Sequence, residues 1–112
     1  MKQVFYAPEG GDIVWISRGP RSARKQAARR PAVVLSPLAY NARVGLAVLC
    51  PITAHIKGYP FEVLIPPGLP VEGAVLADRV ESLDWRAHRA ELICSLPPAV
   101  VEEVLGKLRT LI

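Results

Sequence analysis

The 112-residue sequence has no Asp or Glu between Ile13 and Phe61, a stretch that carries eight Lys and Arg side chains. The rest of the chain carries six basic and ten acidic side chains. The formal net charge of +4 therefore conceals one strongly basic half. A basic half of this kind is typical of domains that bind a polyanion, such as RNA, DNA or an acidic protein segment.

Long apolar runs and cysteines are also scarce. No run approaches the roughly 18 residues that span a bilayer, and the start, MKQVFYAPEGGD, lacks the apolar core and cleavage site of a signal peptide. We therefore expect a cytoplasmic protein with no membrane partner. Cys50 and Cys94 each lie in an apolar run. Because no Cys-x-x-Cys or His-x-x-x-His spacing is present, we expect two buried reduced thiols in preference to a disulfide or a zinc site.

Familiar catalytic motifs are missing as well. The sequence has no Walker loop, GxSxG, HExxH or GxGxxG. Asp78, Glu81 and Asp84 occur close together, but strand spacing does not bring all three to one point. If the protein acts on a nucleic acid, we expect no metal and no other cofactor. Such cleavage is natural for RNA, whose 2′-hydroxyl is already placed beside the phosphate that it attacks.

The patterns that are present predict one mainly β domain of the α+β class over residues 1–112. The strand-like segments are Asp12–Ser17, Pro31–Pro37, Gly45–Thr53, Phe61–Ile65, Gly73–Leu83 (a strand pair or one bent strand) and Ala90–Ser95. Arg18–Arg30 predicts a long basic loop, and Leu38–Arg43 predicts a helical turn closed by Gly45. Helical spacing of apolar residues from Val101 to Leu111 predicts a C-terminal helix. We expect a small, strongly bent antiparallel barrel or sheet with this helix packed on it.

Two positions suit metal-free RNA cleavage. Arg30 directly precedes the buried segment Pro31–Pro37, and the proline after it favours an extended backbone. Thr53 ends the longest strand, at the corresponding edge of the predicted sheet. Arginine offers planar, permanently charged donors to phosphate oxygens, and threonine adds a hydroxyl donor. Taken alone, each residue also fits an ordinary surface role, as an ion-pair partner or as a strand-end hydroxyl.

Four segments, RRPAVVLSPLAYN, CPIT, KGYPFEV and ADRVESLDWRA, follow one another in this order. Through them, and over nearly its whole length, the chain resembles the MazF/PemK family of toxin–antitoxin ribonucleases. The resemblance implies an SH3-like antiparallel β-barrel with a C-terminal α-helix, and a homodimer. It implies a cytoplasmic, metal-independent endoribonuclease that cuts single-stranded RNA, chiefly mRNA, and leaves a 2′,3′-cyclic phosphate and a 5′-hydroxyl. The implied partner is a MazE-like antitoxin whose flexible acidic tail blocks the RNA site.

The resemblance also assigns site residues. The family's catalytic Arg, in its Arg-Pro pattern, falls on Arg30, and its catalytic Thr falls on Thr53. The resemblance implies two roles for this arginine, proton transfer and phosphate stabilisation. We expect the second, because a guanidinium keeps its proton too strongly for an effective general base. The candidate RNA contacts are Lys25, Gln26, Arg29, His55, Lys57, Asp78, Arg79 and Arg86.

The chain departs from the family pattern at four positions, three of which are among the candidate RNA contacts. The differences are Lys25 in place of Glu, Ala28 in place of Gly, His55 in place of Gln and Arg79 in place of Gln. A histidine at such a site can act as an acid or a base, although His55 is equally compatible with a surface turn. We expect the four differences to change base preference more than the fold, since side chains at single-stranded bases set RNA specificity.

Two alternatives from other functional classes stay open. A CcdB-like gyrase-inhibiting toxin shares the fold but cuts nothing, and that family relies on a Trp near the C-terminal end, whereas this chain ends RTLI. A non-catalytic nucleic-acid-binding small barrel would use the same basic surface. Trp15 and Trp85 could then stack bases, or they could pack in a core or an interface. Turnover of RNA separates both alternatives from a ribonuclease.

Overall fold

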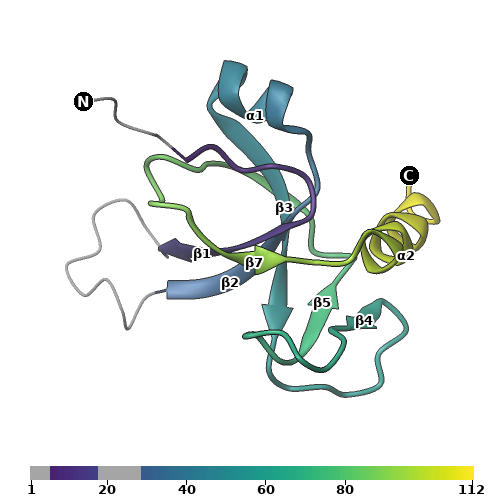
Figure 1. Cartoon of the computed structure of the whole chain (residues 1–112). Coiled ribbons are helices and arrows are strands. Elements are labelled where there is room, and N and C mark those ends of the chain that lie inside the picture. Colours follow the sequence, from purple (N-terminus) through teal and green to yellow (C-terminus); the bar gives the residue numbers. More distant parts are fainter. Residues whose placement is uncertain (1–5, 18–28) are drawn as a thin grey trace.

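The computed structural model describes residues 6–17 and 29–112, and these form seven strands and two helices (Figure 1). In chain order the elements are β1 (Asp12–Ser17), β2 (Arg29–Val34), α1 (Leu38–Val44), β3 (Leu46–Thr53), β4 (Glu62–Leu64), β5 (Ala74–Leu76), β6 (Glu81–Asp84), β7 (Glu91–Ser95) and α2 (Pro98–Arg109). The predicted α+β class is confirmed. Neither helix of the described chain is long and apolar enough to cross a membrane.

The strands build one antiparallel sheet in the order β4-β5-β3-β2-β1-β7, with β6 also paired to β3. β5 and β6 follow one another along the same side of β3. Of the two interpretations of Gly73–Leu83, the structure shows two short strands in succession, separated by residues 77–80. This interruption faces the part of β3 where Pro51 has no backbone N–H to donate.

Arg29 and Arg30, which the sequence assigned to the end of a long loop, belong instead to β2. They pair with Ser17 and Ile16 of β1, so β2 begins two residues before the predicted Pro31. Arginine carries a long flexible stem that a strand accepts at its exposed end, and this allows the ladder to extend beyond the apolar run. The remainder of the predicted loop lies outside the described residues.

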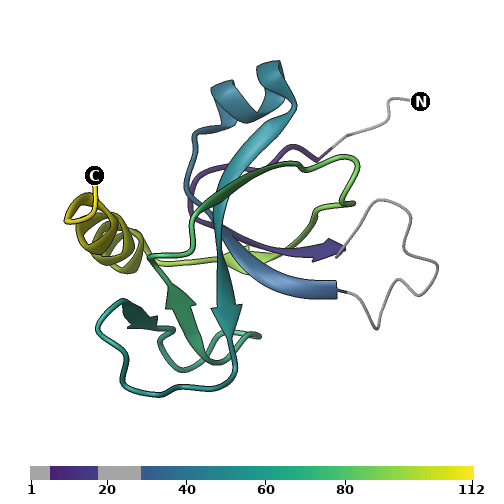
Figure 2. The same ribbon diagram turned by 180° about the vertical axis from the view of Figure 1, so that it is seen from behind.

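The sheet of the described residues is not closed into a barrel, which corrects that part of the prediction. β4 and β7 are its two ends, and α2 lies beside them (Figures 1 and 2). Val104 of α2 packs in one buried cluster with Val63 of β4 and Leu96, which follows β7. Apolar contacts with a helix therefore cover the gap that hydrogen bonds between strands would bridge in a closed barrel.

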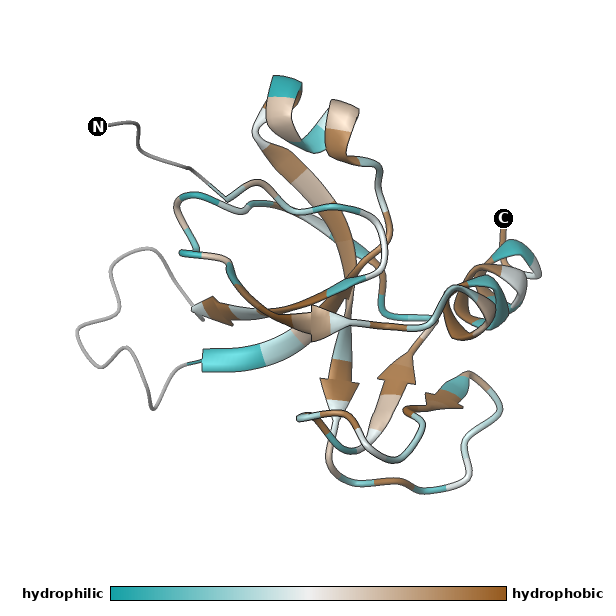
Figure 3. Cartoon of the chain, viewed as in Figure 1, coloured by the Kyte–Doolittle hydropathy of each residue, from teal (hydrophilic) through white to brown (hydrophobic). Residues whose placement is uncertain are grey.

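Apolar side chains cover both faces of the central strands. Ile13 and Val33 join the buried cluster that includes residues of α2, and their neighbours Val14 and Val34 join a second cluster around Trp85. This alternation is the two-residue period of a strand that is buried on both faces. Figure 3 shows the same division, with brown strands in the interior and teal residues at the start of β2 and in the loops. The polar side chains that could act on a ligand are thus placed where strands end.

Both cysteines are free, as predicted: Cys50 is buried in β3, and Cys94 in β7 is half-buried. Burial raises the pKa of the Cys50 thiol to about 11, with a smaller contribution from the charge of Asp78. Burial also raises the pKa of Cys94. Both thiols are therefore held in the protonated form, which is the unreactive one.

Candidate active site

Thr53 is the last residue of β3, and its side chain is held by the turn that follows. Its Oγ1 accepts a hydrogen bond from the backbone N–H of His55 at 3.1 Å. A hydroxyl that accepts through a lone pair still has its own hydrogen to donate. On the other side, the backbone of Thr53 pairs with Ala74 of β5. The Thr53 hydroxyl is thus oriented and half-exposed, ready to donate to an incoming oxygen.

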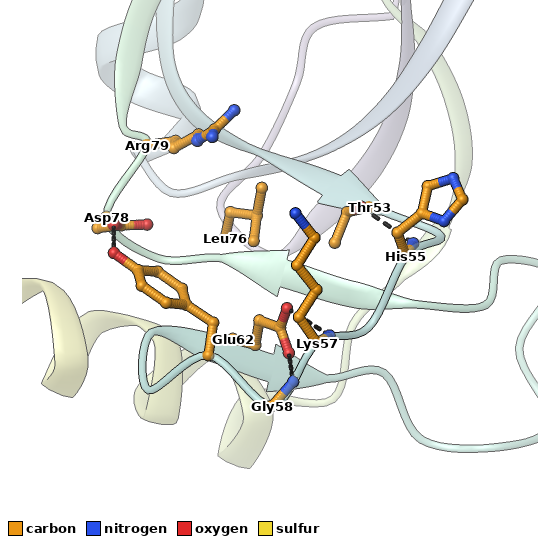
Figure 4. A pocket seen from close by; sticks show the side chains of 9 residues that line it. Thr53, His55, Lys57, Gly58, Glu62, Leu76, Asp78 and Arg79 are labelled. Carbon is orange, nitrogen blue, oxygen red and sulfur yellow. Dashed lines mark hydrogen bonds between the residues drawn. The ribbon is translucent and has the colours of Figure 1, made fainter.

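A hollow of about 610 Å³ opens beside Thr53. Five of the predicted site residues line it, namely Thr53, His55, Lys57, Asp78 and Arg79. Figure 4 shows them coming from two chain segments, one that leaves β3 and one that leaves β5. Residues from distant parts of the sequence therefore meet here because β3 and β5 are hydrogen-bonded neighbours.

Tyr59 and Glu62 also line this hollow, and sequence reasoning did not select them. The Tyr59 hydroxyl donates to Oδ2 of Asp78 at 2.5 Å, and this hydrogen bond raises the pKa of Tyr59. Among the described residues, Oδ1 of Asp78 is buried without a hydrogen-bond partner. The motif KGYPFEV contains both missed residues and was the signal that could have found them.

Glu62 organises the loop that carries Lys57. Its two carboxylate oxygens accept the backbone N–H groups of Lys57 and Gly58, each at 3.0 Å. Gly58 has a φ of +79°, a left-handed conformation that a residue with a side chain rarely adopts. The carboxylates of Glu62 and Asp78 are thus used inside the protein, whereas the charged ends of Lys57 and Arg79 form no ion pair among residues 6–17 and 29–112.

Arg30 lies at the open end of β2, next to the hollow rather than in it. In the β2–β3 ladder, Val34 pairs with Leu49 and Ala32 pairs with Pro51. The ladder ends at this last pair, so Arg30 and Thr53 each lie two residues beyond it, on β2 and on β3. Arg30 is exposed and lines a neighbouring hollow of about 350 Å³. The two predicted catalytic residues therefore lie beyond the same end of the β2–β3 ladder, in two separate hollows.

Arg29 points to the opposite face from Arg30, because neighbouring residues of a strand alternate. Its Nη1 donates to Oε1 of Glu91 at 2.7 Å, and its guanidinium lies 4.7 Å from the centre of the Trp15 ring. These contacts tie the start of β2 across β1 to β7. The structure therefore does not bring Arg29 together with the residues around Thr53.

Arg86 is also placed apart from the Thr53 hollow. Its guanidinium lies 4.8 Å from the centre of the Trp85 ring, and it lines a third hollow with Arg89 and Tyr6. Trp85 itself is a core residue, since it is buried and its Nε1–H donates to the carbonyl of Asn41. The two remaining candidates, Lys25 and Gln26, lie outside the described residues.

The acidic residues do not converge, as expected from strand spacing. Asp78 faces Tyr59, whereas Asp84 accepts the backbone N–H groups of Arg86 and Ala87 in its own turn. In the described part of the chain, no group of three His, Cys, Asp or Glu side chains gathers in a way that could hold a metal ion.

Comparison with known proteins shows the family of the chain. Residues 9–112 match the family model described as PemK-like, MazF-like toxin of type II toxin-antitoxin system. The chain is 40% identical over 107 residues to the endoribonuclease toxin MazF of Escherichia coli K12, covering 96% of each chain. It is 28% identical over 109 residues to the endoribonuclease PemK of Escherichia coli, covering 93% of this chain and 81% of PemK.

Solved structures give the same result. The crystal structure of MazF from Deinococcus radiodurans matches with a TM-score of 0.86 and 50% identity, covering 96% of this chain and 97% of that one. A MazE–MazF crystal structure from the same organism matches with a TM-score of 0.86 and 48% identity, covering 96% of each chain. Fold, site and sequence together define a toxin of the type II toxin–antitoxin class. The chain belongs to the family of PemK-like, MazF-like toxins, whose named relatives are endoribonucleases.

Proposed function

We propose that this protein is a toxin that cleaves single-stranded RNA, chiefly mRNA, by attack of the substrate's own 2′-hydroxyl. The 2′-oxygen forms a bond to the adjacent phosphorus while the bond from phosphorus to the 5′-oxygen breaks. The products are a 2′,3′-cyclic phosphate and a 5′-hydroxyl. This route needs no cofactor, because the nucleophile belongs to the substrate and the protein supplies orientation and charge.

The observation that carries the proposal is that Arg30 and Thr53 both lie two residues beyond the same end of the β2–β3 ladder. The Arg30 guanidinium would hold the two charged oxygens of the phosphorane, for which its planar donors are suited. The Thr53 hydroxyl, oriented by the N–H of His55, would donate to a phosphate oxygen from the β3 side. Both contacts strengthen as negative charge accumulates, and this is how such donors lower the barrier.

The hollow beside Thr53 supports the RNA-binding part of the proposal. Lys57 and Arg79 present cations there, and His55 and Asp78 add groups that can hydrogen-bond to bases. A MazE-like antitoxin with a flexible acidic tail would compete for the same cations. The solved MazE–MazF complex of Deinococcus radiodurans supports such a partner. A homodimer and a cytoplasmic location, where mRNA is available, complete the proposal.

The test is cleavage of a single-stranded RNA in EDTA by the wild type, Arg30→Ala and Thr53→Ala. We expect each variant to lose about 10²- to 10³-fold in rate, as when one transition-state donor is removed. Arg43→Ala is the matched control, since it removes an equal charge from α1 at the far end of β3 (Figure 1). Full activity in both Arg30→Ala and Thr53→Ala would contradict the catalytic role of these residues. RNA binding by the wild type without turnover would point to a non-catalytic binder.

A further inference from the structure

The hollow that Arg30 lines contains two further titratable side chains, Glu81 and His88, and the proposed reaction gives neither a role. This hollow, of about 350 Å³, is lined by residues of four strands and of the turn between β6 and β7, among them Ile16, Arg30, Pro51, Glu81 and His88. Arg30 can stabilise charge, but as an arginine it cannot act as an effective general base. The 2′-hydroxyl must nevertheless lose a proton as it attacks.

His88 is fixed in place by three hydrogen bonds. Its backbone N–H donates to the carbonyl of Asp84, and its carbonyl accepts the N–H of Ser17 at 2.8 Å. Its ring Nδ1 lies 2.9 Å from the carbonyl oxygen of Ser17. Ser17 in turn pairs with Arg29, the residue directly before Arg30. The imidazole is therefore anchored to the same strand end that positions Arg30.

The contact with Ser17 also decides which ring nitrogen is free. A carbonyl oxygen can only accept, so Nδ1 carries a hydrogen, and in the neutral ring Nε2 then carries the lone pair. A hydrogen bond from Nδ1 to a backbone carbonyl is the arrangement that orients a histidine for work at Nε2. The His88 ring is half-buried and lines the same hollow as Arg30, so its Nε2 can accept a proton from a group bound there.

We propose that His88 is the general base of the proposed cleavage, and this inference rests on the ribonuclease function above. Nε2 takes the proton of the 2′-hydroxyl, the 2′-oxygen bonds to phosphorus, and the 5′-oxygen leaves and takes a proton from water. The imidazolium then returns its proton to solvent, so the protein ends unchanged. The charged groups that line this hollow beside His88 are Arg30 from β2 and Glu81 from β6. Arg86 and Arg89 belong to the same turn as His88 but line a different hollow.

The decisive variant is His88→Asn, because an asparagine side chain can keep the donor to the Ser17 carbonyl while losing the titrating ring. We expect its single-turnover rate on RNA to fall by about 10²- to 10⁴-fold, the usual contribution of a general base, with KM little changed. The acidic limb that a titrating imidazole imposes on a pH–rate profile should disappear. Imidazole added to His88→Ala should restore part of the rate. Glu81→Gln is the control, and it should keep the acidic limb.

The outcomes separate the two proposals. If the wild type does not cleave RNA, the proposed function itself fails. If the wild type cleaves and His88→Asn cleaves at a similar rate with the same pH profile, the role of His88 is overturned. A slow His88→Asn with an unchanged acidic limb, together with no rescue of His88→Ala by imidazole, would also overturn it. Loss of that limb in Glu81→Gln would assign the proton transfer to the carboxylate instead.

Discussion

Gly73 lies directly against the carbonyl group of Thr53. A Cβ at residue 73 would overlap the Thr53 carbonyl oxygen and come within 3.0 Å of its carbon. Gly73 also has a φ of +130°, which only glycine adopts without strain. The backbone of the residue that we propose to contact phosphate therefore packs against a glycine 20 positions further along the chain.

Replacing Gly73 with alanine should displace Thr53 and impair catalysis. We expect Gly73→Ala to lose at least about tenfold in kcat, because small shifts of a catalytic donor are costly. Gly68→Ala is the matched control. Gly68 also has a positive φ, of +97°, but a Cβ there meets nothing within 4 Å. Cleavage assays on folded samples of both variants measure the difference, and equal kcat values would show that the contact with Thr53 is unimportant.

Tyr59 should act on RNA binding through Asp78. Tyr59→Phe removes the hydrogen bond to Oδ2, and Asp78 already has a buried Oδ1 without a partner among the described residues. The freed carboxylate should rotate, and we expect KM to rise a few-fold while kcat changes little. Tyr40→Phe, at an exposed position of α1, is the control. A purely structural role for Tyr59 would lower stability and leave KM unchanged.

The salt dependence of binding should distinguish Lys57 from Arg29. A side chain that neutralises one phosphate contributes about 0.7 to the slope of log K against log salt for single strands. Single-stranded DNA serves as the probe, since it lacks the 2′-hydroxyl and is not cleaved. Lys57→Gln should reduce the slope by about this amount, because Lys57 lies in the Thr53 hollow.

Arg29→Gln should leave that slope unchanged, since its guanidinium is already occupied by Glu91 and Trp15. Its effect should appear in stability instead. We expect a loss of about 0.5–1 kcal/mol, the scale of a partly exposed ion pair. Urea unfolding measures this loss. If Arg29→Gln instead reduced the slope of log K against log salt, Arg29 would be an RNA contact after all.

Cys50 should resist thiol reagents in the native state. Its pKa of about 11 lies above the ordinary value of 9.0, so the neutral thiol is favoured by folding. This contribution to stability is fully present below the ordinary pKa and is lost as the pH rises through about 11. In a Cys94→Ser variant, whose remaining thiol is Cys50, labelling at pH 8 should follow global unfolding. Fast labelling of the folded variant would contradict the burial of Cys50.

The sequence could predict those parts of the site that border apolar strands. Arg30 and Thr53 each adjoin a buried run, so the strand pattern marked them, and the family segments agreed. It could not predict the contacts that hold them. Tyr59 reaches Asp78 across 19 positions and His88 reaches Ser17 across 71, and neither contact leaves a local pattern.

The same reason explains the open sheet. The short strands and the terminal helix were evident from periodicity, whereas closure depends on how β3 bends between its partners. β3 leaves β6 at Leu49 and pairs with β5 from Ile52, and this turns the last strands toward α2. Such bending results from packing between distant segments, which a pattern along the chain does not record.

The central claim, that the RNA supplies its own nucleophile to a site built on Arg30 and Thr53, has one direct test. The cut position in a single-stranded RNA is first located from the fragment ends. The same RNA is then made with one 2′-deoxynucleotide on the 5′ side of that bond, and both substrates are incubated with the wild type in EDTA. We predict equal binding, cleavage of the all-ribose RNA to a 2′,3′-cyclic phosphate, and no cleavage at the deoxy position. Cleavage at the deoxy position would contradict the account.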